Sequence, residues 1–547
     1  MPSTTHRLRP PPLRRAPRAA AIAAALGASL SVALVAGCAV GPDYQAPQPQ
    51  VPQDWAKRGS ADPALSAAAN VSTAPLAEDW WTVFNDPALD ALMQRAGRAS
   101  PDLATAALRF AQSRAQRATV AAQRGPTLDL NGAATRQRQS EYGAGTRLID
   151  AVAQGNRDDL VSVLSEPFTL YQAGFDASWE LDLWGRVRRS VEAADADVGQ
   201  SAALLSQMRV TVTSEVARQY FELRLVQRQL AILEQDIAAG EETLQLVQAR
   251  AAGGLVDYLD VERQRTLLAD LRSRHAPLRA RQAAVLNQIG LLVNAEPGEL
   301  AGQLDARPAA DNLRAAPALP SLALGLPGDV IRRRPDIQSA ERQLQAATAN
   351  IGVAIADLYP RIVLGASFGY ESFQGHRLGE WGTRTWQIGP SLSIPIFDQG
   401  RRRAVVVLRE LQQQEAAVAY QQAVLRAWQE LDDALVAYGA ERQRNAELRI
   451  KAQSSAEAYK LAQARYLGGL TDFLVQLDAE RANLAARRDL ADSDSSLYLR
   501  LVAIYKAAGG GAVQEAAQHE AAQAGAAASS PGMAPAGSAP AERQPGL

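Results

Sequence analysis

A single thiol is the most obvious chemical group in this chain. Among 547 residues there is one cysteine, Cys38, and there are four histidines, His6, His275, His376 and His519. The histidines are too scattered for a metal site, and no HExxH, GxSxG or GxxxxGK[ST] motif is present. We therefore expect no enzyme, no metal and no cofactor. The net charge of −1 also gives no bulk attraction to nucleic acid.

The segment before Cys38 has the layout of a secretory signal. Five arginines lie between positions 7 and 18, and an apolar run follows from Ala19 to Ala36. The run ends in Val35-Ala36-Gly37-Cys38, which resembles a bacterial lipobox. The alternative is a free cysteine at the end of a short membrane helix, but no basic flank follows it.

A lipobox implies that Cys38 is the lipid attachment site of an exported protein. Two or more acyl chains would hold the chain far more firmly than one. Ala39 follows in place of the aspartate that retains many lipoproteins in the inner membrane, so we expect the outer membrane, with the rest of the chain extending into the periplasm. With this cysteine consumed, no disulfide framework is available and the fold must be held by packing.

Internal repetition organises the rest of the chain. Ser100 to Leu103 matches Arg334 to Ile337 at an offset of 234 positions, whereas Gly185-Arg186 matches Gly400-Arg401 at an offset of 215. The turn motif Gly253-Gly254-Leu255 also matches its equivalent at 215. The first repeat therefore contains a 19-residue insertion in the polar stretch near residues 131–170, which we expect to be an exposed loop.

Alternating segments predict β-hairpins in both repeats. Phe175, Ala177 and Trp179 alternate with polar residues, which is the period of a strand with one apolar face. The other apolar positions of the expected strands are Leu128 and Leu130, Leu181 and Leu183, every second residue from Ile362 to Tyr370, and Pro390, Leu392, Ile394 and Ile396. We expect four strands per chain, arranged as two hairpins.

Long helices are predicted after each hairpin. Nothing breaks the helix from Arg186 to about Ala251 or from Arg401 to about Tyr466, and at 1.5 Å per residue each would be about 100 Å long. Apolar residues recur at heptad spacing along the first, and a second stripe runs from Val261 to Leu292. His275 lies inside that stripe, so we expect a packed helix residue and no ligand.

A sheet with one apolar and one polar face suits a transmembrane barrel, because lipid cannot satisfy an open sheet edge. Two chains would supply eight strands, whose interior is filled by side chains, and three would supply twelve and leave a lumen. A trimer is therefore the smallest conducting assembly. A soluble, half-buried sheet in a periplasmic coiled-coil lipoprotein is the alternative.

Several separated motifs resemble one known family. They are Gly41 to Tyr44, Trp80 to Leu89, Trp179 to Arg186, Arg334 to Ile337 and Ala349 to Ala354. In this order they resemble the NodT-type lipoprotein branch of the TolC-like outer-membrane factors, from Cys38 to about Gly511. The resemblance implies a mixed α+β membrane protein with an internal duplication, in which a trimeric twelve-stranded β-barrel stands on a long helical coiled-coil tunnel.

The resemblance also implies a function and partners. Such a protein is the outer-membrane channel of a tripartite efflux pump that exports drugs, metals or other toxic small molecules. Its partners would be further copies of itself in a homotrimer, a periplasmic adaptor, an inner-membrane pump of the RND type, and outer-membrane lipid. A type I protein secretion duct and a non-conducting coiled-coil envelope lipoprotein remain as alternatives. The substrate does not follow from this chain.

Two helix-turn motifs are expected at the periplasmic tip, at residues 253–257 and 468–472. Glycine lets the chain reverse there, and Asp257 or Asp472 can cap the following helix. The resemblance implies that the tips dock the adaptor, although both motifs could be turns only. The implied docking residues are Arg250, Gly254, Leu255, Arg465, Gly469 and Leu470.

A constriction of the tunnel is implied at Leu474 and Asp478. These residues are four apart and so lie on one helix face. Leucines would block the passage sterically, and aspartates repeated around a three-fold axis would repel one another. The alternative is that Asp478 is a solvated helix residue with Arg481 as its ion-pair partner.

These patterns divide the chain into six parts. They are a signal peptide (1–37), a lipid-anchored N-terminal segment (38–100), a first repeat of helix, β-hairpin, long helix and helix (101–297), an equatorial linker (298–334), a second repeat (335–508) and a low-complexity tail (509–547). The tail is rich in Ala, Gly, Ser and Pro, and we expect it to be disordered. The roles of the tail and of the 131–170 loop stay open.

Overall fold

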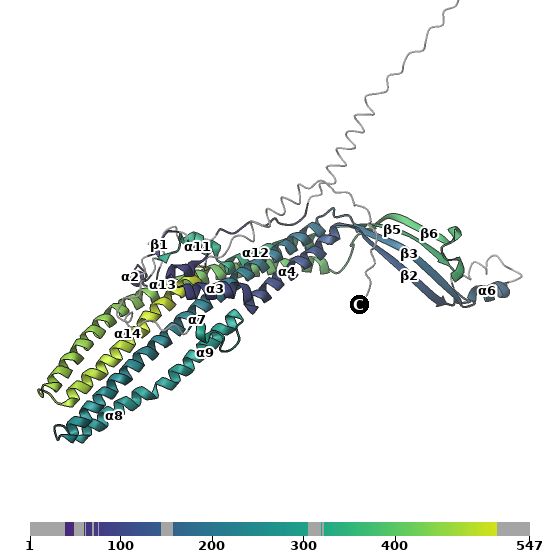
Figure 1. Cartoon of the computed structure of the whole chain (residues 1–547). Helices are drawn as coiled ribbons and strands as arrows, with labels where there is room; N and C mark the ends of the chain where they lie inside the picture. The colour runs from purple at the N-terminus through teal and green to yellow at the C-terminus, as the bar shows by residue number, and fades with distance from the viewer. Residues whose placement is uncertain are drawn as a thin grey trace, which may run out of the picture. The chain divides into compact units, whose positions relative to one another are not determined.

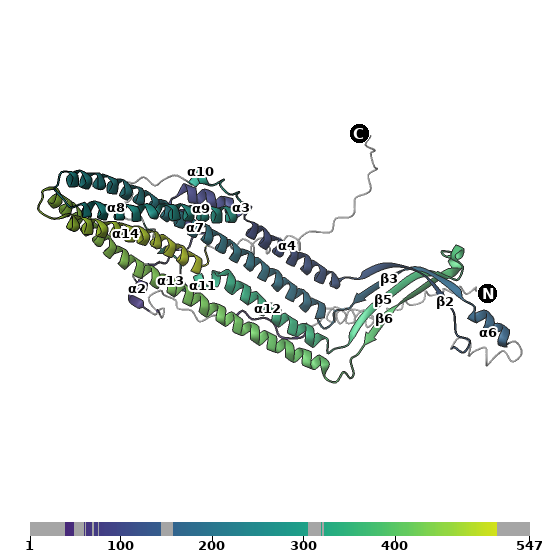
Figure 2. The same ribbon diagram turned by 90° about the horizontal axis from the view of Figure 1, so that it is seen from below.

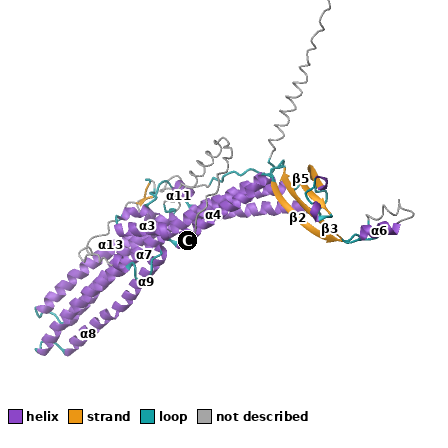
Figure 3. Cartoon of the chain, turned by 45° about the vertical axis from the view of Figure 1, so that its right-hand side comes forward, coloured by secondary structure: helices purple, strands orange, loops and turns teal. Residues whose placement is uncertain are grey.

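The computed structural model describes residues 39–48, 60, 62–67, 71–74, 76–143, 157–304, 319 and 322–510 (Figures 1 and 3). Cys38, the signal segment and the tail from residue 511 lie outside the described residues. The chain falls into two compact units. Unit 1 comprises Met1–Ala46, Ser113–Val198 and Gln343–Ala417, and unit 2 comprises Pro47–Gln112, Gly199–Arg342 and Val418–Leu547.

Unit 1 contains a four-stranded antiparallel sheet (Figure 1). Its strands are β2 (Thr127–Gln137), β3 (Phe168–Glu180), β5 (Arg361–Ser372) and β6 (Arg384–Ser393), in the spatial order β2-β3-β5-β6. The prediction of four strands in two hairpins is confirmed. The hairpins join edge to edge through β3 and β5.

The strand register reproduces the internal repeat. Asn131 lies opposite Gly174 in the first hairpin, and Gly365 lies opposite Gly389 in the second. These two pairs are related by the same offsets, 234 and 215, that the sequence motifs show. The two hairpins are therefore equivalent residue by residue.

Two strands end earlier than the alternation predicts. Leu181 and Leu183 lie beyond β3, because the Leu183 N–H turns back to the Leu181 carbonyl oxygen at 2.8 Å. Ile394 and Ile396 lie beyond β6, where Pro395 has no N–H to donate to a ladder. Alternation continues past the last strand residue in both repeats, although the Leu181 N–H still donates to the Ile362 carbonyl oxygen of β5 at 3.0 Å.

The inserted loop is shorter than the polar stretch from which it was inferred. Residues 131–137 belong to β2, so the connection to β3 spans 138–167, and it is 19 residues longer than the 373–383 connection between β5 and β6. Its described part contains the helix α6 (Arg157–Ser165). The shorter connection contains two 3-10 turns, η5 (Gly375–Arg377) and η6 (Trp381–Thr383).

Helices lead into and out of every hairpin (Figure 2). Before the strands stand α4 (Pro101–Ala121) with its 3-10 turn η3 (Ala122–Arg124), and α12 (Pro335–Ala356). After them follow α7 (Arg186–Ala252) and α13 (Arg401–Leu467), each 67 residues long. The two predicted long helices are confirmed, and each contributes residues to both units.

In unit 2 the long helices are followed by return helices. The second repeat returns through α14 (Phe473–Ala507). The first returns through α8 (Tyr258–Ser273) and α9 (His275–Val293), which are separated at Arg274. The apolar stripe from Val261 to Leu292 thus covers two helices, because Pro277 cannot donate a hydrogen bond to the Ser273 carbonyl.

The main core of unit 2 explains the tryptophan motif. Trp80, in η2 (Trp80–Phe84), is fully buried and stacks on Tyr505 with ring centroids 4.9 Å apart. Asn85 then adopts a left-handed conformation, and Asp86 caps α3 (Pro87–Ala99) by accepting from the Ala88 N–H at 3.0 Å. The motif from Trp80 to Leu89 therefore has a structural role, which is to fill the core of unit 2 and to begin α3.

Short elements complete unit 2. They are α2 (Pro63–Ala67), α10 (Ala301–Leu304), α11 (Pro327–Arg333) and the parallel pair β1 (Val71–Ser72) and β4 (Leu322–Ala323). The motif beginning at Arg334 secures the end of α14, since the buried Arg334 guanidinium donates to the Ala507 carbonyl oxygen at 2.7 Å and pairs with Asp336 and Glu430. Within the described ranges, no helix combines the length and apolar character needed to cross a membrane.

Candidate functional site

The four-stranded sheet carries most of its apolar side chains on one face and most of its polar side chains on the other. Paired residues of antiparallel strands share a face, so the register assigns each side chain. One face carries Leu128, Leu130, Phe175, Ala177, Trp179, Ile362, Leu364, Phe368, Tyr370, Trp386, Ile388 and Leu392. The other carries Asp129, Asn131, Gln172, Asp176, Ser178, Glu180, Ser367, Glu371, Gln387 and Ser391.

Most of the large apolar side chains on the first face are exposed within the chain. Leu130, Trp386 and Ile388 are each about two-thirds or more exposed. On the polar face, side chains bond across strands, with Asn131 donating to Asp176 at 2.7 Å and Gln172 donating to Glu371 at 2.8 Å. The sheet thus offers a face suited to lipid and a face suited to water.

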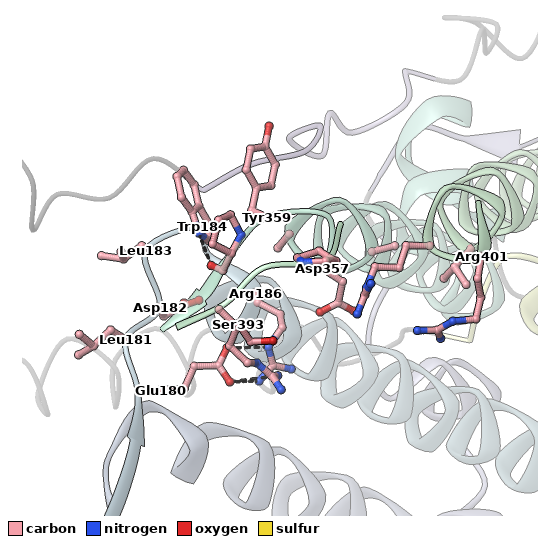
Figure 4. A pocket seen from close by; sticks show the side chains of 17 residues that line it. Glu180, Leu181, Asp182, Leu183, Trp184, Arg186, Asp357, Tyr359, Ser393 and Arg401 are labelled. Carbon is pink, nitrogen blue, oxygen red and sulfur yellow. Dashed lines mark hydrogen bonds and ion pairs between the residues drawn. The ribbon is translucent and has the colours of Figure 1, made fainter. Parts of the chain in front are cut away.

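A charged cluster lies where β3 passes into α7 (Figure 4). Arg186 donates two hydrogen bonds of 2.8 Å to the two carboxylate oxygens of Glu180, and Arg361 lies 3.1 Å from the same carboxylate. Asp182 caps α7 by accepting from the Val187 N–H at 3.0 Å. These residues line a cavity of about 430 Å³ at the end of the sheet.

The equivalent junction of the second repeat is built differently. Asp398 caps the start of α13 through the Gly400 and Arg402 N–H groups. Pro395 takes the place of Glu180, so the Arg401 side chain has no ion pair in the part of the chain that the structure describes. Figure 4 shows Arg401 apart from the Glu180–Arg186 pair.

Each helical hairpin of unit 2 ends in a glycine turn. Gly254 has φ +70° and Gly469 has φ +69°, conformations that glycine adopts without steric cost. Asp257 caps α8 and Asp472 caps α14, as predicted. Leu255 is 75% exposed and Leu470 is 73% exposed, so each tip carries a solvent-exposed leucine.

The two tip arginines differ. Arg250 donates to the Tyr466 and Leu467 carbonyl oxygens at 3.2 and 3.0 Å, and its guanidinium lies 4.6 Å from the centre of the Tyr466 ring. It therefore ties the end of α7 to the end of α13. The side chain of Arg465, its repeat equivalent, is exposed and forms no hydrogen bond or ion pair within the described ranges.

The residues expected at the constriction point away from the core of their hairpin. Leu474 and Asp478 are exposed, whereas Phe473 and Leu477 are buried in the small core between the hairpins. Asp478 and Arg481 form no ion pair with each other or with other described residues. The equivalents of Leu474 and Asp478 in the first repeat are Leu259 and Arg263, and Arg263 lies 3.1 Å from Asp260.

A buried carboxyl pair lies in the same hairpins and was not predicted. Glu480 is 4% exposed and Asp236 is 5% exposed, and Asp236 accepts a 2.6 Å hydrogen bond from Arg487. Burial, followed by the charge of Asp236, raises the pKa of Glu480 to about 7. Glu480 lies among charged residues on α14, and only its helical phase relative to Leu477 and Leu484 marks it as buried.

Other predicted residues carry little chemistry. His275 is half-buried, with its Nε2 atom 3.8 Å from Glu234, which agrees with a packed helix residue. Within the described residues, no three His, Cys, Asp or Glu side chains are grouped as they would be around a metal ion. Cys38 lies outside those residues, so the geometry of the lipid attachment site is not described.

Solved structures with the same fold define the class of protein. The chain resembles the outer-membrane channel OprN with a TM-score of 0.75 and 33% sequence identity, covering 86% of this chain and 99% of that one. It resembles the open state of the MtrE outer membrane channel of Neisseria gonorrhoeae with a TM-score of 0.70 and 28% identity, covering 87% and 98%. The fold is that of an outer-membrane channel.

Sequence comparison shows the family. The model of the outer membrane efflux protein family matches residues 92–295 and 326–510. The solvent efflux pump outer membrane protein SrpC of Pseudomonas putida is 32% identical over 421 residues, which are 76% of this chain and 83% of SrpC. This chain belongs to the outer membrane efflux protein family. It serves efflux transport in the outer membrane, which confirms the predicted function, and the family's role is transport, not catalysis.

Proposed function

We propose that three copies of this chain close a twelve-stranded barrel in the outer membrane, and that this barrel and its helical tunnel conduct small molecules out of the cell. The single observation that carries the proposal is a four-stranded sheet with one apolar face, one polar face and no strand beyond β2 or β6 in the described part of the chain. A periplasmic adaptor and an inner-membrane pump of the RND type would supply the substrate.

The strands have the dimensions of a membrane wall. They are 10 to 13 residues long, and a tilted transmembrane strand needs about 9 to 11. The outer edges of β2 and β6 leave backbone N–H and C=O groups unpaired, and lipid cannot satisfy them. Pairing β6 of one copy with β2 of the next removes both edges.

The internal repeat gives the register of that pairing. β6 is the equivalent of β3 and β2 is the equivalent of β5, so the β3–β5 contact inside the chain serves as a template. Ser178 opposite Gly365 becomes Ser393 opposite Asn131 of the next copy, and both side chains lie on the polar face. On the apolar face, Trp179 opposite Leu364 becomes Ile394 opposite Leu130.

A cysteine pair tests both the trimer and the register. Ser393→Cys combined with Asn131→Cys should crosslink with a short thiol reagent into covalent dimers and trimers, because opposed residues have Cβ atoms about 5 Å apart. Ser393→Cys with Gly132→Cys is the matched control, since a one-residue slip puts the two side chains on opposite faces. Only monomers from the first pair, in protein whose mass in detergent is also monomeric, would overturn the barrel.

We also propose the remaining residue roles and segment boundaries. Residues 1–37 would be removed and Cys38 acylated, ahead of the N-terminal segment (38–100), the repeats (101–297 and 335–508), the linker (298–334) and the tail (509–547). Cys38→Ser should abolish labelling by radioactive palmitate, and continued labelling would remove the anchor.

Adaptor docking would use the tips. The exposed leucines Leu255 and Leu470, with the open backbone at Gly254 and Gly469, could receive an adaptor's helical hairpin. Arg250 is engaged within the chain and Arg465 has no side-chain partner among the described residues, so the leucines and glycines are the contacts expected with the adaptor. Cysteines placed at Leu255 and Leu470 should crosslink to the adaptor in intact cells, and cysteines that never do so would reduce both motifs to turns.

A further inference from the structure

The first described residues of the chain are fastened to unit 1 as a strap, residues 39–44. The Val40 N–H donates to the Trp184 carbonyl oxygen at 3.1 Å. Arg189 donates from Nε to the Val40 carbonyl oxygen and from Nη2 to the Gly41 carbonyl oxygen, each at 3.3 Å. Both backbone polar groups of Val40 are thus bonded to the β3–α7 region.

Arg189 is a buried residue in which each of the three guanidinium nitrogens has at least one partner. It is 5% exposed, and besides the two carbonyl oxygens it pairs with Asp43 at 2.7 Å and Glu192 at 2.8 Å. A buried guanidinium requires such compensation, and removing it would leave the strap carbonyls without their donors. Arg189 is therefore the main polar attachment of the strap.

Two glycines allow the strap to lie close to α12. A Cβ atom on Gly41 would lie 2.5 Å from the Gly352 Cα atom, and Gly41 has φ +94°, where other residues are strained. A Cβ atom on Gly352 would lie 2.8 Å from the Arg189 Cγ atom. Strap, α12 and α7 meet at one point, which accounts for both the Gly41 to Tyr44 motif and the Ala349 to Ala354 motif.

The internal repeat provides a comparison within the chain. The equivalent of Arg189 in the second repeat is Ala404, and the equivalent of Gly352 in the first repeat is Ala118. Each repeat therefore contributes one clamp residue, Arg189 from the first and Gly352 from the second, and each of these residues is absent from the equivalent position of the other repeat. A general requirement of the strand-to-helix junction would have placed them in both repeats.

The strap ends at the strand-to-helix junction. A Cβ atom on Gly185 would lie 2.8 Å from the Ala39 Cα atom, and Gly185 stands between the end of β3 and the start of α7. Cys38 immediately precedes Ala39 in the sequence, so no linker separates the expected acylated residue from the docked strap.

We propose that Arg189, Gly41 and Gly352 form a clamp that holds the acylated N-terminus at the β3–α7 junction and so fixes the depth of the acyl chains relative to the sheet. The clamp recognises backbone carbonyl groups, and the ligand it positions is a diacylglyceryl group. This inference rests on the proposed lipid anchor and membrane sheet. Arg189 is a positioning residue, since it acts on the anchor through the strap.

A spin label at the residue that follows the strap tests the clamp. Gln45 is exposed, and in the acylated full-length protein Gln45→Cys supplies the one free thiol for a nitroxide. We expect an immobilised spectrum in this background. Arg189→Met should weaken strap docking on the order of 100-fold through the loss of charge-assisted hydrogen bonds, and the spectrum should become mobile.

Two further variants separate the clamp from general damage. Gly41→Ala alters only the strap and should also release the label, although no helix or strand of unit 1 is changed. Arg401→Met removes an exposed arginine whose side chain has no described partner and should leave the label immobilised. A label that stays immobilised in both Arg189→Met and Gly41→Ala, or one already mobile in the parent, would overturn the clamp.

Depth and acylation are read separately. The accessibility of the nitroxide to dissolved oxygen, relative to its accessibility to a water-soluble nickel complex, measures its depth in vesicles of outer-membrane lipid. The parent protein should show one depth, and the two clamp variants should show a distribution that extends toward water. Palmitate labelling should persist in all variants. Absence of palmitate from the parent would contradict the lipid anchor itself, while label mobility would still report whether Arg189 holds the strap.

Discussion

The two helical hairpins, α7–α8 and α13–α14, end in tips with matching backbones and different side-chain contacts. Both turn through a glycine at positive φ, both expose a leucine, and both begin the return helix with an aspartate cap. Arg250 of the first tip binds the end of α13. Arg465, in the same place on the second tip, binds no other described residue through its side chain.

This difference between the repeats can be used to predict a contact between copies of the chain. In the proposed trimer, a contact that the first repeat makes with the second within one chain is expected again between the second repeat and the first repeat of the next copy. By the repeat offset, Arg465 should bind the carbonyl oxygens of Ala251 and Ala252 of a neighbouring copy. The hairpins also differ in charge, since Asp478 and Glu480 of α14 replace Arg263 and Arg265 of α8.

The largest effect is expected from removing the side chains of the proposed tunnel constriction, Leu474 and Asp478 of α14. Leu474→Ala combined with Asp478→Ala should raise single-channel conductance severalfold and admit vancomycin to intact cells. The small alanine side chains would widen the proposed constriction around the three-fold axis, and alanine preserves the helix because it has the highest helix propensity. The control is Leu259→Ala with Arg263→Ala in the first hairpin. An equal or greater effect from the control would place the constriction elsewhere.

The buried carboxyl group should make stability depend on pH. Glu480 has a pKa of about 7 in the folded protein against 4.5 for the unperturbed group, so the cost of ionising it appears as pH rises from 4.5 to 7. The free energy of unfolding should fall by about 3 kcal/mol over that range, and Asp236, whose pKa burial also raises, adds in the same direction. Arg481 opposes the shift, and Tyr459 faces the same site.

Glu480→Gln tests this dependence in thermal melts between pH 4.5 and 8. The variant should lose most of the fall in melting temperature, because glutamine does not ionise. Arg265→Gln, at the equivalent position of α8, removes an exposed ion pair with Glu262 and should leave the pH slope unchanged. An unaltered slope in Glu480→Gln would assign the titration to other groups.

The tip arginines should separate stability within the chain from stability of the assembly. Arg250→Ala removes two hydrogen bonds and one cation–π contact and should cost about 2 kcal/mol at the end of α13, seen as faster amide hydrogen exchange in monomers and trimers alike. Arg465→Ala should speed exchange near Ala251 in trimers only. Faster exchange in the monomeric Arg465 variant would contradict the repeat-based assignment.

The smallest effects are expected from the aspartate caps, which both tips share. Asp257→Ala and Asp472→Ala each remove a cap and should each cost about 1 kcal/mol of local helix stability. Circular dichroism and hydrogen exchange of the first turns of α8 and α14 would measure this. Unequal losses would show that one aspartate has a second contact that the other lacks.

Periodicity and repetition predicted the secondary structure because both are local signals. Alternation between Phe175 and Trp179 predicted a strand, and a long stretch without proline predicted α7, which is 67 residues long. Strand ends were predicted less well, because apolar residues such as Ile394 continue past the last ladder bond. The break at Arg274 was missed because the heptad stripe passes over it unaltered.

The contact partners of individual side chains could not be predicted from residue spacing alone. Arg250 was assigned to docking from a resemblance, and its bonds to Tyr466 and Leu467 depend on packing between segments more than 200 residues apart. The Arg189 clamp had a usable signal that spacing rules ignore, namely a difference between equivalent positions in the two repeats. Differences between repeats therefore carry information that the shared motifs do not.

The unpaired edges of β2 and β6 have a consequence for the kinetics of biogenesis. In the proposed trimer the last ladders form only between chains, so the sheet would not complete its folding in a first-order reaction. The rate of the final step should rise with the surface density of chains in the membrane, and dilute chains should persist as protease-sensitive species with exposed edges. Expression level would then set how quickly a folded channel appears as well as how many channels form.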